Sequence, residues 1–281
     1  MALGGNPVFA NNKNFKDTPS SQRGGAYGST DTMPGQAQLS AQQLQELYTK
    51  PSAGPAQTGR MTYDDVIMKT VLTLTLVLVG AALGWMVPVL MWPGMILGLI
   101  LGLVNSFKKQ PSPALILCYA GFEGMFLGGI SGLLERIYPG IVVQAVLGTL
   151  SVFIVTLVLF RNAKIRATPK MTRFFIIALA GYALFSMINF FLMMFNVTST
   201  PWGVNGMDIP GTNIPFGVVI GLLAIGLAAF SLIVDFTSIE KGVQNGLPAR
   251  YSWTAAFGLT VTLVWLYMEI LRLLAILRGN D

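Results

Sequence analysis

Four ionisable side chains stand in stretches that are otherwise apolar: Glu123, Asp235, Glu269 and Arg272. A charge at the centre of a membrane span costs about 2.5–3.5 kcal/mol, so such residues normally face the protein interior, pair with one another or mark the path of an ion or proton. Carboxylate oxygens are also the ligands that a hard cation such as Ca²⁺ prefers. The chemistry that these residues suggest is proton exchange and weak cation binding.

The four residues differ in their local surroundings. Glu269 and Arg272, in "LVWLYMEILRLLAIL", are three positions apart and are therefore neighbours on one helix face. The arginine either simply neutralises the glutamate or tunes it. Asp235, in "SLIVDFTSIEKG", and Glu123, in "CYAGFEGMFLGG", have no basic residue close by in the sequence. Burial disfavours the charged form of a carboxyl group, so these acids are candidates to exchange a proton as the pH changes.

Several kinds of chemistry are excluded by composition. The chain has no histidine, so it can form no Ser-His-Asp or Cys-His arrangement, and it lacks the usual proton switch near neutral pH. Its one cysteine, Cys118, cannot form an intramolecular disulfide. We therefore predict that the protein is not an enzyme and has no cofactor, with Ca²⁺ only as a transported ion.

The elements that must position these charges are membrane-spanning helices. Of the 281 residues 53% are hydrophobic and only 11% are charged, whereas soluble domains carry about 25% charged residues. The apolar residues form seven blocks, each near the ~20 residues that cross a bilayer. The blocks cover residues 66–87, 89–107, 113–134, 141–160, 172–195, 214–241 and 253–277. The predicted fold class is an all-α polytopic membrane protein, a bundle of seven transmembrane helices.

Glycines recur at the spacing of one helix turn in two of these blocks. Small residues four apart let membrane helices approach closely. The second block has this pattern at Gly94, Gly98 and Gly102, and the third has it at Gly121, Gly124, Gly128 and Gly132. We expect these two helices to pack tightly.

The amino-terminal region differs from the rest of the chain. Residues 1–60 are rich in Gly, Ser, Gln, Asn and Pro, and such a segment is predicted to be a disordered tail. Residues 61–281 then form the membrane domain. Thr62 with Asp65 three positions later resembles a helix-start box, so Asp65 is expected to cap a helix and not to bind a ligand.

Basic residues predict the orientation of the chain in the membrane. The connection "RNAKIRATPKMTR" carries five basic residues and no acid, and the connections with Lys108 and Lys109 and with Lys241 and Arg250 are also basic. All three lie on one side if the amino terminus is cytoplasmic, and seven spans then put the carboxyl terminus outside. The net charge of +6 is thus explained by topology and by lipid headgroups, and no nucleic-acid partner is expected.

Three segments together resemble the transmembrane Bax inhibitor motif family: "GFEGMFLGGISG", "VDFTSIEKG" and "LYMEILRLLAIL". The similarity covers about residues 60–278 and is greatest to the bacterial branch, whose extended tail often begins near "NPVF". It implies a seven-helix bundle with the last helix central. It also implies a pH-sensitive calcium leak across the bacterial plasma membrane.

In this family two acids on the sixth and seventh helices share a proton. By position these correspond to Asp235 and Glu269, which would also be weak Ca²⁺ ligands, and Glu123 corresponds to the acid of the family's "EG" element. The chain departs from the family pattern at Glu269, usually an aspartate, and at Arg272, commonly an asparagine.

In a straight hairpin Asp235 lies ~9 Å from the end of its span and Glu269 ~24 Å into the next. Tilt would bring the two acids level, and Asp235 with Glu123 is the alternative pair.

Two other classes of function are alternatives to the leak. The first is a non-conducting regulatory protein that binds a membrane protease or another membrane partner, because some members of the family are similar to such modulators. The second is an intramembrane enzyme, which is disfavoured because the chain lacks a glycine-flanked aspartate motif and would need Glu269 in place of an aspartate.

Overall fold

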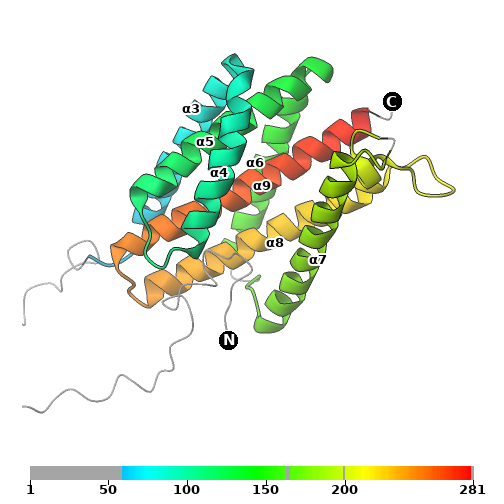
Figure 1. Cartoon of the computed structure of the whole chain (residues 1–281). Coiled ribbons are helices and arrows are strands. Elements are labelled where there is room, and N and C mark those ends of the chain that lie inside the picture. Colours follow the sequence, from blue (N-terminus) through cyan, green and yellow to red (C-terminus); the bar gives the residue numbers. More distant parts are fainter. Residues whose placement is uncertain (1–58, 163–164, 199, 280–281) are drawn as a thin grey trace, which may run out of the picture.

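The computed structural model describes residues 59–162, 165–198 and 200–279. Its long helices are α3 (Tyr63–Met86), α4 (Met91–Phe107), α5 (Pro113–Ile137), α6 (Ile141–Arg161), α7 (Pro169–Met194), α8 (Phe216–Gln244) and α9 (Ser252–Arg278). All seven, α4 together with the short helix before it (Pro88–Phe107), are long and apolar enough to cross a membrane, which confirms the predicted all-α polytopic bundle (Figure 1). The predicted disordered tail lies outside the described residues except for residues 59 and 60.

Three short 3₁₀ helices complete the described part of the chain. They are η3 (Pro88–Leu90), η4 (Gly203–Gly206) and η5 (Ala249–Tyr251). The first links α3 to α4, the second lies between α7 and α8, and the third turns the chain from α8 into α9. Because η5 is so short, α8 and α9 form an antiparallel hairpin.

The start of α3 follows the predicted capping pattern. The backbone N–H of Asp65 donates to Thr62 Oγ1 at 3.1 Å, so Thr62 is the N-cap residue. Asp65 also accepts from Lys69 Nζ at 2.7 Å, one turn further along. Asp65 therefore serves the end of the helix, as expected.

Prolines and caps set the other helix boundaries more sharply than hydropathy does. α7 begins at Pro169, three residues before the apolar block predicted it, because Thr168 caps it by accepting from the N–H of Met171 at 3.3 Å. Proline suits the first helical position since its missing N–H would have no partner there. Pro88 similarly follows the end of α3 and opens η3.

Glycines bring α3 and α5 into backbone contact, so the small-residue prediction for α5 is confirmed. A Cβ added at Gly128 would collide with the carbonyl oxygen of Ala81, and one added at Gly124 would collide with that of Val77. α4 packs against α5 in the same way. A Cβ added at Gly94 of α4 would lie only 2.7 Å from the backbone nitrogen of Phe126. The three helices form one closely packed layer.

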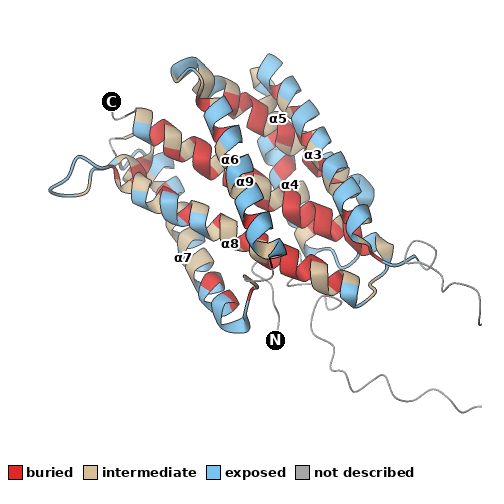
Figure 2. Ribbon diagram, turned by 180° about the vertical axis from the view of Figure 1, so that it is seen from behind, coloured by how far each residue is buried: buried red, intermediate tan, exposed pale blue. Residues whose placement is uncertain are grey.

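Helix α9 lies at the centre of the bundle. In an apolar stretch of 18 residues within this span 67% of the residues are buried, compared with 11–44% in stretches of the same length in the other six spans. It packs against α3, α5, α6 and α8. Figure 2 shows buried residues along α9, with exposed residues on the outward sides of the surrounding helices. Most residues of α9 are therefore surrounded by protein and not by lipid.

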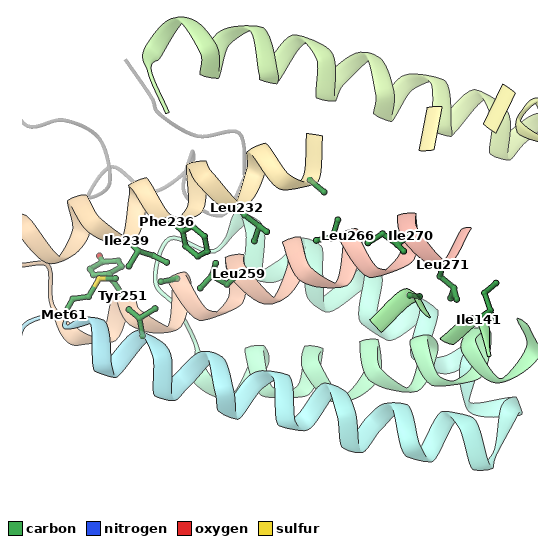
Figure 3. Packing of buried hydrophobic residues seen from close by; sticks show 14 of the residues in the cluster. Met61, Ile141, Leu232, Phe236, Ile239, Tyr251, Leu259, Leu266, Ile270 and Leu271 are labelled. Carbon is green, nitrogen blue, oxygen red and sulfur yellow. The ribbon is translucent and has the colours of Figure 1, made fainter. Parts of the chain in front are cut away.

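The largest apolar cluster follows α9 from one end to the other (Figure 3). Tyr251 and Ile239 lie at the α8–α9 turn, Leu232 and Leu266 near the middle, and Ile141 at the far end. Large apolar side chains are also exposed on the outer faces of α3, α4, α6 and α7. So much exposed apolar surface is unfavourable in water and is favourable in contact with lipid.

Candidate functional site

Asp235 is buried completely between α8 and α9, with an exposed fraction of 0%. Thr262 of α9 donates a hydrogen bond from Oγ1 to Asp235 Oδ2 at 2.6 Å. Ala228 and Leu232 precede Asp235 on the face of α8 that joins the central cluster. The apolar stripe that docks α8 on α9 thus carries the carboxylate into the middle of the protein.

Further polar side chains lie on the same two helices. Ser231, Thr237 and Ser238 of α8 and Thr260 of α9 are all buried. Ser238 donates to the backbone oxygen of Val234 at 2.8 Å, and Thr260 Oγ1 lies 2.9 Å from Thr73 Oγ1 of α3. A hydroxyl that donates to its own helix keeps lone pairs with which it can accept. We call Ser231, Asp235, Ser238 and Thr262 the polar seam.

Glu269 lies in a second cluster, further along α9. Its Oε1 accepts from Trp265 Nε1 at 3.0 Å and from the Tyr182 hydroxyl of α7, and its Oε2 accepts from Arg272 Nη2. The same Arg272 nitrogen donates to Tyr182 at 3.1 Å. The side chain of Glu269 is only 6% exposed and that of Arg272 is 23% exposed. Arg272 therefore neutralises Glu269, and the pair fastens α7 to α9.

The Asp235 and Glu269 clusters lie at different depths. Thr262, which binds Asp235, precedes Glu269 by seven residues on α9, which is two turns or about 10.5 Å along the axis. A straight hairpin predicts that the two acids lie at different depths, and the positions of their partners on α9 agree with that expectation. Asp235 accepts from Thr262, whereas Glu269 accepts from Trp265, Tyr182 and Arg272, and the sharing of a proton between the two acids stays a prediction.

Glu123 occupies a third position, between α5 and α4. A Cβ added to Gly98 of α4 would lie 2.7 Å from Glu123 Oε2, so the glycine makes room for the carboxylate. Within the part of the chain that the structure describes, no hydrogen bond or ion pair joins Glu123 to another side chain. Glu123 thus faces α4, whereas Asp235 lies at the α8–α9 interface, and the alternative pair also stays a prediction.

Sequence reasoning missed three residues of these clusters. Trp265 precedes Glu269 by four residues and Thr262 stands on the buried face of α9, so helical spacing could have identified both. Tyr182 is on another helix, 87 positions from Glu269, and no local pattern points to it.

The carboxylates do not form a metal centre of the usual kind. Among the described residues no three His, Cys, Asp or Glu side chains gather where they could hold a metal ion. Ca²⁺ takes 6–8 oxygen ligands at about 2.3–2.6 Å, so tight binding would need many more carboxylates and carbonyls around one point. The polar seam offers one carboxylate and several hydroxyls.

The fold and the acidic side chains between its helices define a polytopic membrane protein of seven apolar helices with α9 at the centre. A sequence model of the Bax inhibitor 1 like family matches residues 6–279, so the chain belongs to that family. The match begins about fifty residues before the region of resemblance, 60–278, and takes in most of the amino-terminal segment. No curated protein matches the chain.

Proposed function

We propose that this protein is a pH-sensitive calcium leak in the bacterial plasma membrane, controlled by protonation of Asp235. The observation that carries the proposal is the complete burial of this carboxylate beside the central helix, with Thr262 as hydrogen-bond donor. Acids are rare inside membrane spans, and those that face the bundle interior typically mark the route of an ion or proton.

The polar seam is suited to a weakly held cation. An ionised Asp235 supplies negative charge, and the hydroxyls of Ser231 and Ser238, four and three positions away on the same helix, supply neutral oxygens. Few ligands mean low affinity, and an ion must leave a leak path as readily as it enters. Protonation of Asp235 removes the charge, so we expect flux to fall as the pH falls.

Four charged groups on or beside α8 and α9, other than Asp235, form ion pairs. Arg272 and Glu269 of α9 are two or more turns away, and Arg166 forms an ion pair with Glu240 at 3.0 Å near the basic end of α8. Since these charges are already compensated, we assign the pH response to Asp235. In this proposal Glu269 is a fixed structural partner of Arg272 and Glu123 is a secondary proton-sensing residue.

The orientation is part of the proposal. The α4–α5 and α8–α9 connections, which carry Lys108, Lys109, Lys241 and Arg250, lie at one end of the bundle, away from the carboxyl terminus (Figure 1). By the bias of basic residues toward the cytoplasm, this end is cytoplasmic. The amino terminus is then inside and the carboxyl terminus outside.

We also propose that the protein is not an intramembrane protease. An aspartyl protease site needs two carboxylates close enough to share one proton. The separation of the Asp235 and Glu269 clusters along α9 argues against that arrangement. The carboxylate of Glu123, which faces α4, offers no second acid to either cluster.

A second candidate function is regulation of a membrane partner such as a protease. Helix α7 favours this function, because only 11% of the residues in its apolar 18-residue stretch are buried. Phe174, Ile177 and Phe190 are exposed on it. If the protein works only in this way, removing residues 1–58 would abolish co-purification of a partner, and purified protein would carry no calcium.

The proposal is tested with purified protein in liposomes that contain a calcium indicator. Wild type should admit Ca²⁺ at pH 8, and Asp235→Asn should admit much less. Glu269→Gln with Arg272→Gln, which removes both members of an ion pair, is the control and should retain flux. A calcium influx no greater than that of empty liposomes would refute conduction.

A further inference from the structure

A deep apolar groove opens on the side of the bundle between α3 and α6. Its volume is about 500 Å³, which falls in the range of small-molecule sites. α3 packs on α5 and α9, and α6 packs on α9 and α8, so the floor between them is formed by α5 and α9. The groove is separate from the polar seam, since none of the seam residues lines it.

The floor and the rim of the groove differ in exposure. Leu127 and Val264 on the floor are buried, as is Val77 on the adjoining part of α3, with exposed fractions of 6–8%. Leu78 and Val146 on the two rims are exposed, at 70% and 42%. The groove is thus open to the surroundings of the bundle, and in a membrane those surroundings are hydrocarbon.

The few polar groups of the lining are already paired. Ser131 Oγ lies 2.7 Å from the Tyr267 hydroxyl, and Thr149 donates to the backbone oxygen of Ala145 at 2.8 Å. These hydroxyl groups therefore need no hydrogen-bond partner from a ligand. A water molecule needs 2–4 polar partners, so water is a poor occupant. An empty groove would leave its lining without contacts on one side. An apolar occupant is required.

The length of the groove matches one leaflet of a bilayer. On α3 it runs from Leu74 to Trp85, eleven residues or about 16.5 Å. Half of a hydrocarbon core of about 30 Å is about 15 Å. Leu74 lies near the middle of α3 and Trp85 next to its end. Tryptophan is enriched at the level of the headgroups, so the groove extends from the midplane to one surface.

We propose that this groove binds one acyl chain of a membrane phospholipid. The lipid belongs to the leaflet on the side of the α5–α6 connection, because the groove lies beside the end of α5 and the start of α6. The chain inserts between α3 and α6 with its end against the buried floor. This site does not depend on calcium conduction.

Photolabelling in lipid nanodiscs tests the site. The probe is phosphatidylglycerol with a diazirine in the middle of one acyl chain, and labelled positions are identified by mass spectrometry. Wild type should be labelled on the floor at Leu127 or Val264 at least as strongly as at Leu99, which is exposed on α4. Ordinary annular lipid would label Leu99 and leave the floor unlabelled, which would overturn the proposal.

Two variants that fill the groove make the test specific. Val146→Trp fills it from α6 and should reduce floor labelling several-fold without changing the label at Leu99. Leu78→Trp fills it from α3 and serves if the first variant does not fold. Val143→Trp adds the same bulk on α6 at an exposed position outside the lining and should change nothing. Equal floor labelling in filled and control variants would contradict an acyl-chain site.

Discussion

Thr262 Oγ1 donates a hydrogen bond to Asp235 Oδ2 across the α8–α9 interface, over 2.6 Å and with both residues buried. This contact fixes the register of the last two helices. It also separates Asp235 from Glu269, because Thr262 lies two turns of α9 before the glutamate. Asp235, which accepts from Thr262, and Glu269, which is paired with Arg272, therefore lie in different polar clusters.

Replacing Thr262 by valine should destabilise the protein, because it leaves a buried carboxylate without this donor. The loss of a hydrogen bond to a buried polar group costs about 1–3 kcal/mol. Thermal unfolding of purified protein at fixed pH measures the effect. Thr262→Ser retains the hydroxyl and should recover most of the stability. Equal stability of the valine and serine variants would show that the contact is unimportant.

Replacing Arg272 by glutamine should be costly, because Glu269 would remain as a nearly buried charge without its ion-pair partner. Breaking a buried pair by removing one member costs about 3 kcal/mol or more. The double variant with Glu269→Gln removes both charges and should be more stable than Arg272→Gln alone. If unfolding curves place the double variant below the single one, the ion pair does not have the neutralising role assigned to it.

Two glycines of α5 offer a matched test of helix packing. Gly128→Ala should destabilise the α3–α5 contact by about 1–3 kcal/mol, because the new Cβ collides with the backbone oxygen of Ala81. Gly121→Ala places its Cβ in open space and should be neutral or slightly stabilising, since alanine favours helix. The comparison is made by thermal unfolding. Similar effects of the two substitutions would contradict the backbone contact.

Much of the fold could be predicted from local patterns in the sequence. Apolar blocks give the seven helices, a three-residue spacing gives the Glu269–Arg272 pair, and Thr62 gives the start of α3. These features depend on residues close together in the chain, where helical geometry alone decides which side chains meet.

The remaining features depend on contacts between distant segments. The partnership of Tyr182 with Glu269 requires α7 to cross α9 at one particular height, and hydropathy does not specify that height. The groove between α3 and α6 results from how four helices pack, which no single helix determines. The depth of Asp235 relative to Glu269 could be estimated from hairpin geometry, but their hydrogen-bond partners could not.

In the proposed function, Asp235 makes the calcium leak sensitive to pH. The most direct test is calcium influx into liposomes from about pH 5.5 to about pH 8.5, comparing wild type with Asp235→Asn. We predict that wild-type flux falls with acidification, whereas the asparagine variant has a low flux that does not vary with pH. A pH profile of the variant with the same midpoint and amplitude as wild type would contradict the account.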